Sequence, residues 1–124
     1  MQTAVIIQAR IGSTRLPNKM ITPFYQDQNL LEFLLNRLVN GGLKNQLVLA
    51  IPRLAENDVL EDIATKFNIK VIRGPENDVL QRFIEAAESV NAELIIRVCA
   101  DNPFLDVSSI PFLIKFLEEK EADY

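Results

Sequence analysis

Short apolar runs alternate with helical patterns four times along these 124 residues, and this alternation restricts the possible folds more than any other feature. The runs predict strands at Ala4–Gln8, Gln46–Ile51, Ile69–Ile72 and Leu94–Val98. Strands that alternate with helices are typical of a mostly parallel sheet with helices on its faces. The sequence therefore predicts one α/β domain over residues 1–124, which is long enough to bury a core of its own.

Apolar residues at helical spacing predict four helices, and we interpret these stripes as core. They comprise Leu31, Leu34, Leu35 and Leu38; Val59, Leu60, Ile63, Ala64 and Phe67; Val79, Leu80, Phe83, Ile84 and Ala87; and Ile110, Leu113, Ile114 and Leu117. Gly41 and Gly42 are typical of a helix end. The chain stops after the fourth helix, where another strand is due, so we expect an uncovered sheet edge.

Composition narrows the class of protein. The formal net charge is -4 and the isoelectric point about 4.8, which argues against binding to nucleic acid or to an anionic membrane surface. No run approaches the length of a membrane span, and the first residues do not resemble a signal peptide. We therefore expect a cytoplasmic protein.

Cys99 is the single cysteine, which excludes an internal disulfide and favours a reducing compartment. The chain has no histidine, so we interpret Cys99 as structural rather than nucleophilic. The lack of histidine also disfavours zinc, whereas oxygen ligands and Mg²⁺ fit the composition better.

A basic turn follows the first predicted strand. It presents three cations, two hydroxyls and one glycine: Arg10, Gly12, Ser13, Thr14, Arg15 and Lys19. Positive charge and a backbone that can curl around oxygens are what a polyphosphate requires. An ordinary solvated basic loop explains the same residues equally well.

Ligands of open parallel sheets bind beyond the carboxyl ends of the strands, so the other loops at these ends are the next candidates. Asp101 directly follows the fourth predicted strand, where it faces the same sheet edge as Arg10 and Lys19 and suits Mg²⁺ on phosphate oxygens. A turn-forming aspartate is the alternative. Asp106 is better explained as the N-terminal cap of a helix over residues 107–120.

The two remaining loops carry weaker signals. Asn77 and Asp78 directly precede a helix, which favours capping, but Arg73 and Gly74 beside them suit a sugar or ribose hydroxyl. We place Arg82, one turn later, on the polar face of that helix. The residues Glu56, Asn57 and Asp58 of the other loop are typical of the start of a helix.

Three segments, at residues 6–19, 71–80 and 96–106, together resemble the cytidylyltransferase family. Their sequences are Ile-Ile-Gln-Ala-Arg-Ile-Gly-Ser-Thr-Arg-Leu-Pro-Asn-Lys, Val-Ile-Arg-Gly-Pro-Glu-Asn-Asp-Val-Leu and Ile-Arg-Val-Cys-Ala-Asp-Asn-Pro-Phe-Leu-Asp. The resemblance is strongest to the branch of spore coat polysaccharide biosynthesis protein F, related to acylneuraminate and 3-deoxy-manno-octulosonate cytidylyltransferases. It covers essentially the whole chain, and its first segment is the most specific.

The resemblance implies a three-layer αβα sandwich of the nucleotide-diphospho-sugar transferase type, of which this chain is the N-terminal part. It also implies CTP and Mg²⁺ as ligands. Carried over by position, the triphosphate contacts would be Ala9, Arg10, Gly12, Ser13, Arg15 and Lys19; the metal ligand Asp101; and the ribose or sugar contacts Asn77, Asp78 and Arg82. Arg10, Lys19 and Asp101 would be the catalytic residues.

Two departures from the family pattern stand out. Relatives usually have Thr-Gly-Asp-Cys-Pro-Leu where this chain has Cys-Ala-Asp-Asn-Pro-Phe at residues 99–104, which keeps the aspartate and the proline but loses the threonine and the glycine. Relatives also continue for roughly as long again, about a further domain's length. That continuation is expected to hold further strands, a second metal ligand, part of the sugar pocket and the contacts of a homodimer.

Two functions remain open. The first is transfer of CMP from CTP to a hydroxyl of a sugar, expected to be acidic, with release of pyrophosphate, in surface or spore-coat polysaccharide synthesis. The second is a nucleotide-binding module that does not turn over. A flavodoxin-like or receiver-type regulator ranks last, because such a protein needs an acidic cluster after the first strand, where this chain has Arg10.

Overall fold

The computed structural model describes residues 2–12, 18–121 and 123. Its main sheet has four parallel strands in the order β5-β4-β1-β6. Their bounds are Thr3–Gln8 for β1, Leu47–Pro52 for β4, Lys70–Gly74 for β5 and Leu94–Cys99 for β6. All four predicted strands are thus present, with ends that differ by one or two residues from the prediction.

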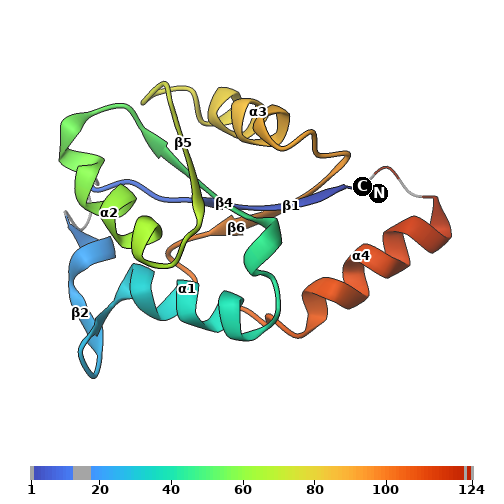
Figure 1. Cartoon of the computed structure of the whole chain (residues 1–124), viewed down its shortest axis with the longest axis horizontal. Helices are drawn as coiled ribbons and strands as arrows, with labels where there is room; N and C mark the ends of the chain where they lie inside the picture. Colours follow the sequence, from blue (N-terminus) through green and yellow to red (C-terminus); the bar gives the residue numbers. More distant parts are fainter. Residues whose placement is uncertain (1, 13–17, 122, 124) are drawn as a thin grey trace.

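The helices cover both faces of the sheet and make a three-layer α/β sandwich (Figure 1). They are α1 at Leu30–Asn40, α2 at Asp58–Lys66, α3 at Val79–Ser89 and α4 at Ser109–Lys120. Helix α3 lies on one face, whereas α1, α2 and α4 lie on the other (Figure 1). The predicted αβα architecture is confirmed.

Alternate residues of the central strands face opposite layers and form two cores. Val5 and Ile7 pack with the leucines of α1, whereas Ala4 and Ile6 pack with Phe83 of α3. These four residues of β1 are fully buried. The near-continuous apolar sequence of β1 is therefore explained by helices on both sides, as is typical of parallel sheets.

The order in which strands are added to the sheet reverses at β1. Gln8, the last residue of β1, pairs with Ala50 of β4 on one side and with Cys99 of β6 on the other. The chain leaves β1 toward β4 and returns to the other side of β1 only with β6. The loops after β1 and β6 consequently flank the point of reversal, which is the usual ligand site of an open α/β sheet.

A small antiparallel hairpin, absent from the sequence prediction, precedes α1. It consists of β2 at Pro23–Tyr25 and β3 at Gln28–Asn29, and it follows a 3-10 turn, η1, at Lys19–Ile21. Helix α1 then begins with a capping box, in which Asn29 and Glu32 each accept a hydrogen bond from the other's backbone amide. Two more 3-10 turns, η2 at Lys44–Gln46 and η3 at Ala55–Asn57, precede β4 and α2.

The start of α4 differs from the prediction. The helix begins at Ser109 rather than Val107, and the Asp106 side chain does not cap it. Asp106 Oδ1 instead accepts a hydrogen bond from the Ser108 hydroxyl at 2.6 Å, while its carbonyl accepts from the Ser109 amide at 3.3 Å. The Asp106 carboxylate is thus held by a neighbouring hydroxyl, two residues too early to reach the first free amides of the helix.

Helix α4 and strand β6 leave apolar side chains at the surface. Phe112, Leu113 and Phe116 of α4 and Ile95 of β6 are exposed. Cys99 is exposed as well, so it is not part of the core. Among the described residues, none of the helices is long and apolar enough to cross a membrane.

Candidate active site

Two charged residues meet where β1 and β6 end. Lys19 lies on η1, after the turn that follows β1, and Asp101 lies two residues beyond β6. The Lys19 Nζ and Asp101 Oδ2 atoms are 3.7 Å apart, and 35% and 58% of the two side chains remain exposed. An exposed ion pair of this kind is weak, so stronger charges of a ligand can displace it. The predicted convergence of Lys19 and Asp101 at one edge of the sheet is confirmed.

Side-chain hydrogen bonds from η3 fix the first part of the basic turn. The Ile11 amide donates to Oδ1 of Asn57 at 2.8 Å, and Asn57 is fully buried. The Asn57 Nδ2 group donates to the carbonyl of Leu54 at 3.3 Å. Asn57 is the residue before α2, but its side chain makes no capping bond to that helix. The interpretation of Asn57 as a helix-start residue therefore missed its main role, which is to hold the basic turn.

The two described ends of the basic turn are joined to each other. The Asn18 amide donates to the carbonyl of Ile11 at 3.3 Å, and Asn18 has a positive φ of 61°. A Cβ added to Gly12 would lie 2.9 Å from Oε1 of Glu56, which is the far end of an exposed side chain on η3. The described residues on either side of the basic turn are therefore joined by a backbone bond.

The predicted phosphate contacts divide between described and undescribed positions. Arg10 is exposed at the start of the turn, as an accessible cation should be. Ala9 is buried, and its amide donates to the carbonyl of Ala50 at 3.2 Å, so this amide is already paired. Ser13 and Arg15 lie outside the described residues, and their predicted contacts stay predictions.

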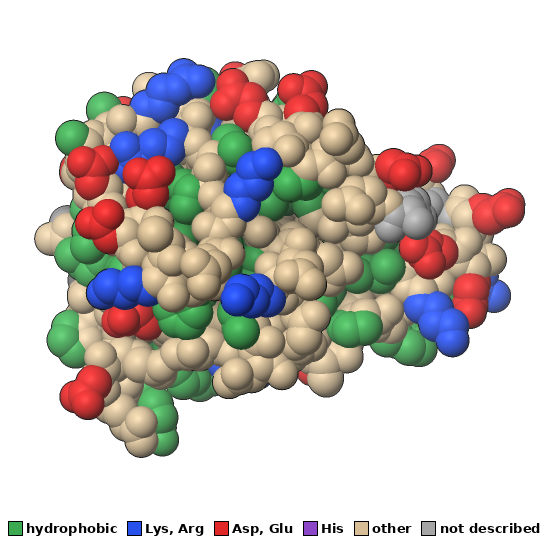
Figure 2. All heavy atoms as spheres, viewed as in Figure 1, with side chains coloured by type: hydrophobic (Ala, Val, Ile, Leu, Met, Phe, Trp, Pro, Cys, Tyr) green, Lys and Arg blue, Asp and Glu red, His purple; other side chains and the backbone are tan. Residues whose placement is uncertain are grey.

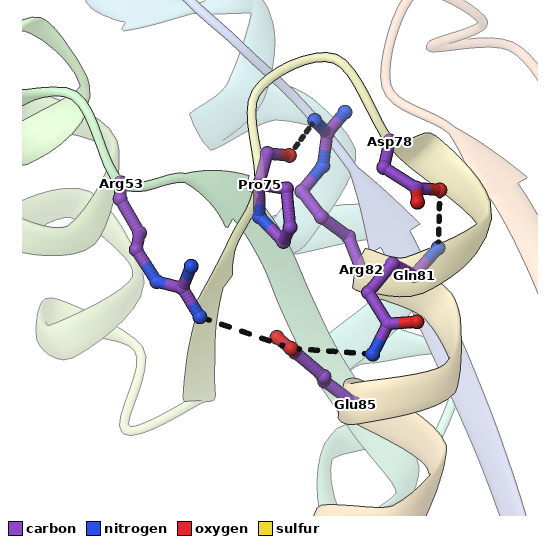
Figure 3. A network of polar contacts seen from close by, with 6 residues as sticks. All are labelled: Arg53, Pro75, Asp78, Gln81, Arg82 and Glu85. Carbon is purple, nitrogen blue, oxygen red and sulfur yellow. Dashed lines mark hydrogen bonds and ion pairs between the residues drawn. The ribbon is translucent and has the colours of Figure 1, made fainter.

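Arg82 holds the loop after β5 from beneath (Figure 3). Its Nη1 group donates to the carbonyls of Pro75 and Glu76 at 2.8 and 2.6 Å. The side chain is fully buried, so its predicted place on the polar face of α3 is wrong. The physical reason is the fold of the loop, which lies over the guanidinium and covers it. The predicted contact of Arg82 with ribose stays a prediction.

The rest of the Arg82 guanidinium is short of acceptors. Its Nε and Nη2 atoms are buried and have no hydrogen-bond partner among the described residues. Burial lowers the pKa of Arg82 below its ordinary value, and the nearby charge of Arg10 lowers it further, whereas Glu76 and Asp78 raise it. Unpaired buried donors are costly, so this side chain is held in the loop at some cost in stability.

The other residues of the loop after β5 have mostly structural contacts. Asp78 caps α3, because its Oδ1 accepts from the Gln81 amide at 3.0 Å (Figure 3), and this confirms the capping interpretation. Asn77 is exposed. Arg73 pairs with Asp58 at 2.8 Å, which ties the end of β5 to the start of α2. A ribose contact of Asn77 or Asp78 stays a prediction.

Basic and acidic side chains are mixed on the surface of the molecule. Figure 2 shows Lys and Arg side chains interspersed with Asp and Glu on the face seen there. An ion pair joins Arg53, after β4, to Glu85 of α3, with 3.8 Å between Nη2 and Oε1 (Figure 3).

The residues present suit Mg²⁺ only in company with a ligand. Among the described residues, three or more His, Cys, Asp or Glu side chains do not gather into a metal-binding group. Asp101 supplies one carboxylate opposite Lys19. Because Mg²⁺ is commonly held by one or two carboxylates together with substrate phosphates, one carboxylate fits a metal that arrives on a nucleotide.

The chain resembles proteins of known family along nearly its whole length. The sequence model described as Cytidylyltransferase matches residues 4–124. The spore coat polysaccharide biosynthesis protein SpsF of Bacillus subtilis is 37% identical over 123 residues, which are 96% of this chain and 51% of SpsF. A 3-deoxy-manno-octulosonate cytidylyltransferase of Chloroherpeton thalassium is 30% identical, over 91% of this chain and 47% of that protein.

Solved structures agree with this match. A cytidylyltransferase from Leptospira borgpetersenii superposes with a TM-score of 0.92 at 34% identity, over 98% of this chain and 51% of that one. A CMP:2-keto-3-deoxy-manno-octonic acid synthetase complexed with CTP has the same fold, with a TM-score of 0.79 at 19% identity, over 98% of this chain and 49% of that one.

The chain thus spans about half the length of the relatives that it matches. The match includes the basic turn, the loop after β5 and the loop that carries Asp101, and it bears out the resemblance noted in the sequence. The chain belongs to the cytidylyltransferase family.

Proposed function

We propose that this protein transfers CMP from CTP to a hydroxyl of a sugar and releases pyrophosphate. The observation that carries the proposal is the meeting of Lys19 and Asp101, 3.7 Å apart, at the reversal point of the sheet. Membership of the cytidylyltransferase family supports the reaction class. One structure with this fold is complexed with CTP, which supports the choice of nucleotide.

The proposed reaction asks the protein mainly to position groups and to neutralise charge. The sugar oxygen forms a bond to the α-phosphorus of CTP, the bond from that phosphorus to the bridging oxygen of the β-phosphate breaks, and the hydroxyl proton passes to solvent water. Arg10 and Lys19, with Arg15, stabilise the charge that develops on pyrophosphate. Asp101 is the proposed ligand of Mg²⁺, which when bound neutralises charge on the phosphate oxygens.

An acidic sugar is the acceptor class that we propose. Two of the similar proteins are named for 3-deoxy-manno-octulosonate or for the corresponding octonic acid. The similarity to SpsF supports a place in surface or spore-coat polysaccharide synthesis. We propose the cytoplasm, where CTP is available, as the compartment and a homodimer as the assembly of the full-length form.

A pyrophosphate-release assay with CTP, Mg²⁺ and a panel of acidic and neutral sugars tests the proposal. Lys19→Met and Asp101→Asn are expected to lower the rate by about 10²-fold or more, since both remove charge from the reacting region. The matched controls are Lys115→Met and Glu119→Gln, which change the exposed pair on α4 at 3.9 Å. Full rates in both site variants would overturn the assigned roles.

A nucleotide-binding module without turnover is the second candidate, because the chain spans only about half of its relatives. Calorimetric titration with CTP and Mg²⁺ distinguishes the two. Binding without pyrophosphate release under every sugar supports the module, and release with any sugar supports the transferase. A thermal-shift comparison of CTP with UTP, ATP and GTP tests the base preference in the same samples.

A further inference from the structure

One face of α1 contacts the segment that comes after Asp101 in the sequence. Phe33, Arg37 and Gly41 are spaced by four residues, so they lie on the same face of the helix. The ring of Phe33 packs edge-on against Phe104, with 5.8 Å between the centroids. At the far end of this face, a Cβ on Gly41 would lie 2.5 Å from Cγ1 of Val107, so the glycine makes room for this contact.

Arg37 makes the polar contacts of this face. Its Nη1 group donates to the carbonyls of Pro103 and Leu105, both at 2.7 Å, across 66 and 68 residues of sequence. Hydrogen bonds from a charged donor are stronger than those between neutral groups. The guanidinium thus holds the backbone on both sides of Phe104.

The segment has other constraints as well, because the Ala100 amide donates to the carbonyl of Gln8 at 3.2 Å and both Ala100 and Pro103 are buried. Residues 100–106 contain no helix or strand. The backbone bonds of the turn run from the Asn102 amide to Cys99 at 3.1 Å and from the Leu105 amide to Asn102 at 3.4 Å. The placement of Asp101 beyond the end of β6 therefore depends on the bond from Ala100 to β1 just before it and on the bonds of Arg37 just after it.

Helix α1 also contacts the element that carries Lys19. The 3-10 turn η1 packs against α1, and Met20, next to Lys19, is 4% exposed within the core that the α1 leucines form. One helix consequently holds both members of the Lys19–Asp101 pair. Lys19 is placed through apolar packing and Asp101 through Arg37.

We propose that Arg37 is a positioning residue that holds Asp101 opposite Lys19 by its two bonds to the following segment. This role acts through the backbone of the segment and requires no contact of Arg37 with the nucleotide or the metal. The consequence for binding rests on the function proposed above. The consequence for the backbone does not, and this difference separates a failure of one proposal from a failure of the other.

The first experiment measures the backbone alone, by amide hydrogen exchange in the full chain. Arg37→Met is expected to speed exchange at Asn102 and Leu105 by about tenfold or more, as loss of a hydrogen bond to a charged group implies. Exchange in β1 reports the overall stability and corrects for any general loosening. Arg53→Met is the matched control, because Arg53 follows β4 and pairs with Glu85 of α3, outside this segment and outside β6.

Arg37→Lys keeps the charge and a donor but not the forked geometry, so we expect exchange between that of the wild type and that of Arg37→Met. This variant also keeps the test decisive if Arg37→Met does not fold. Unchanged exchange at Asn102 and Leu105 in the folded variants overturns the positioning role.

The second experiment titrates CTP with Mg²⁺ and with a chelator in its place. Arg37→Met is expected to reduce the gain in CTP affinity that Mg²⁺ provides by about 10- to 100-fold, the usual effect of losing a group that orients a metal ligand. In the Asp101→Asn background the same change should have no further effect on that gain. An equal loss with and without Mg²⁺ contradicts the proposal. If the wild type does not bind CTP, the proposed function fails, and the exchange experiment still decides the role of Arg37.

Discussion

Individual polar side chains fix the loops of the candidate site, together with a few backbone bonds such as the one from Ala9 to Ala50. Arg37 and Arg82 each donate from one nitrogen to two carbonyls of a loop, and Asn57 accepts from the amide of Ile11. Beyond its first residue, a loop at the carboxyl end of a strand has no neighbouring strand to pair with, so its other backbone groups need other partners. These three side chains meet that need.

Asn57→Ala is expected to lower the free energy of unfolding by about 1–3 kcal/mol, because it leaves the buried Ile11 amide without an acceptor. Urea denaturation monitored by circular dichroism measures the change. Asn45→Ala, at an exposed position of η2, is the control and should stay within about 0.5 kcal/mol of the wild type. Equal stabilities of the two variants would mean that Asn57 does not hold the basic turn.

At the level of elements, a helix on each face of the sheet holds one loop of the candidate site through an arginine. Helix α1 contributes Arg37 to the segment after Asp101, and α3 contributes Arg82 to the loop after β5. Both helices begin with a side-chain cap, from Asn29 in α1 and Asp78 in α3. Because a cap fixes where a helix begins, it also fixes which loop each arginine can reach.

Asp78→Ala is expected to destabilise the protein by about 0.5–2 kcal/mol through loss of the α3 cap. Asp78→Asn should retain the stability, since asparagine caps about as well as aspartate. Thermal and chemical denaturation of both variants measure this, with Asp62→Ala on the exposed surface of α2 as the control. A wild-type stability for Asp78→Ala would show that the cap contributes nothing.

The same pair of variants tests the predicted ribose contact. CTP titration of Asp78→Asn, the variant that keeps the cap, isolates the charge of the carboxylate from the stability of α3. Weaker binding supports the contact with ribose, and wild-type binding restricts Asp78 to capping.

In the whole molecule, the central strand and the edge strand of the sheet differ in how fully their backbone is paired. Strand β1 is central and paired along both edges, whereas β6 is paired with β1 alone among the described strands. Alternate residues of β6 are exposed, including Ile95. Ile95 at this edge and the phenylalanines of α4 are apolar groups that the described residues leave exposed.

We expect amide exchange in β6 to be faster than in β1, whose amides should open only when the whole domain unfolds. Exchange measured by mass spectrometry at several protein concentrations tests this. Exchange in β6 as slow as in β1, and slower still as the concentration rises, would contradict the expectation and show that another copy covers the edge.

The elements themselves could be predicted from the sequence, because they depend on neighbours in the chain. The apolar spacing of Leu31, Leu34 and Leu38 indicates a helix wherever that helix ends up. Even the meeting of Lys19 with Asp101 followed from a general rule, since the carboxyl ends of parallel strands lie at the same edge. The hairpin at Pro23–Tyr25 and Gln28–Asn29 was missed because its strands are too short to show alternation.

Only the tertiary structure decided the contacts between residues that are far apart in the sequence. The burial of Arg82 depends on how the loop after β5 folds over it, and the role of Asn57 depends on an amide 46 residues away. The sequence by itself determined the α/β class, the family and the loops that carry charge. Which side chains hold those loops was settled by packing, because a hydrogen bond forms between groups that the fold brings together, whatever their separation along the chain.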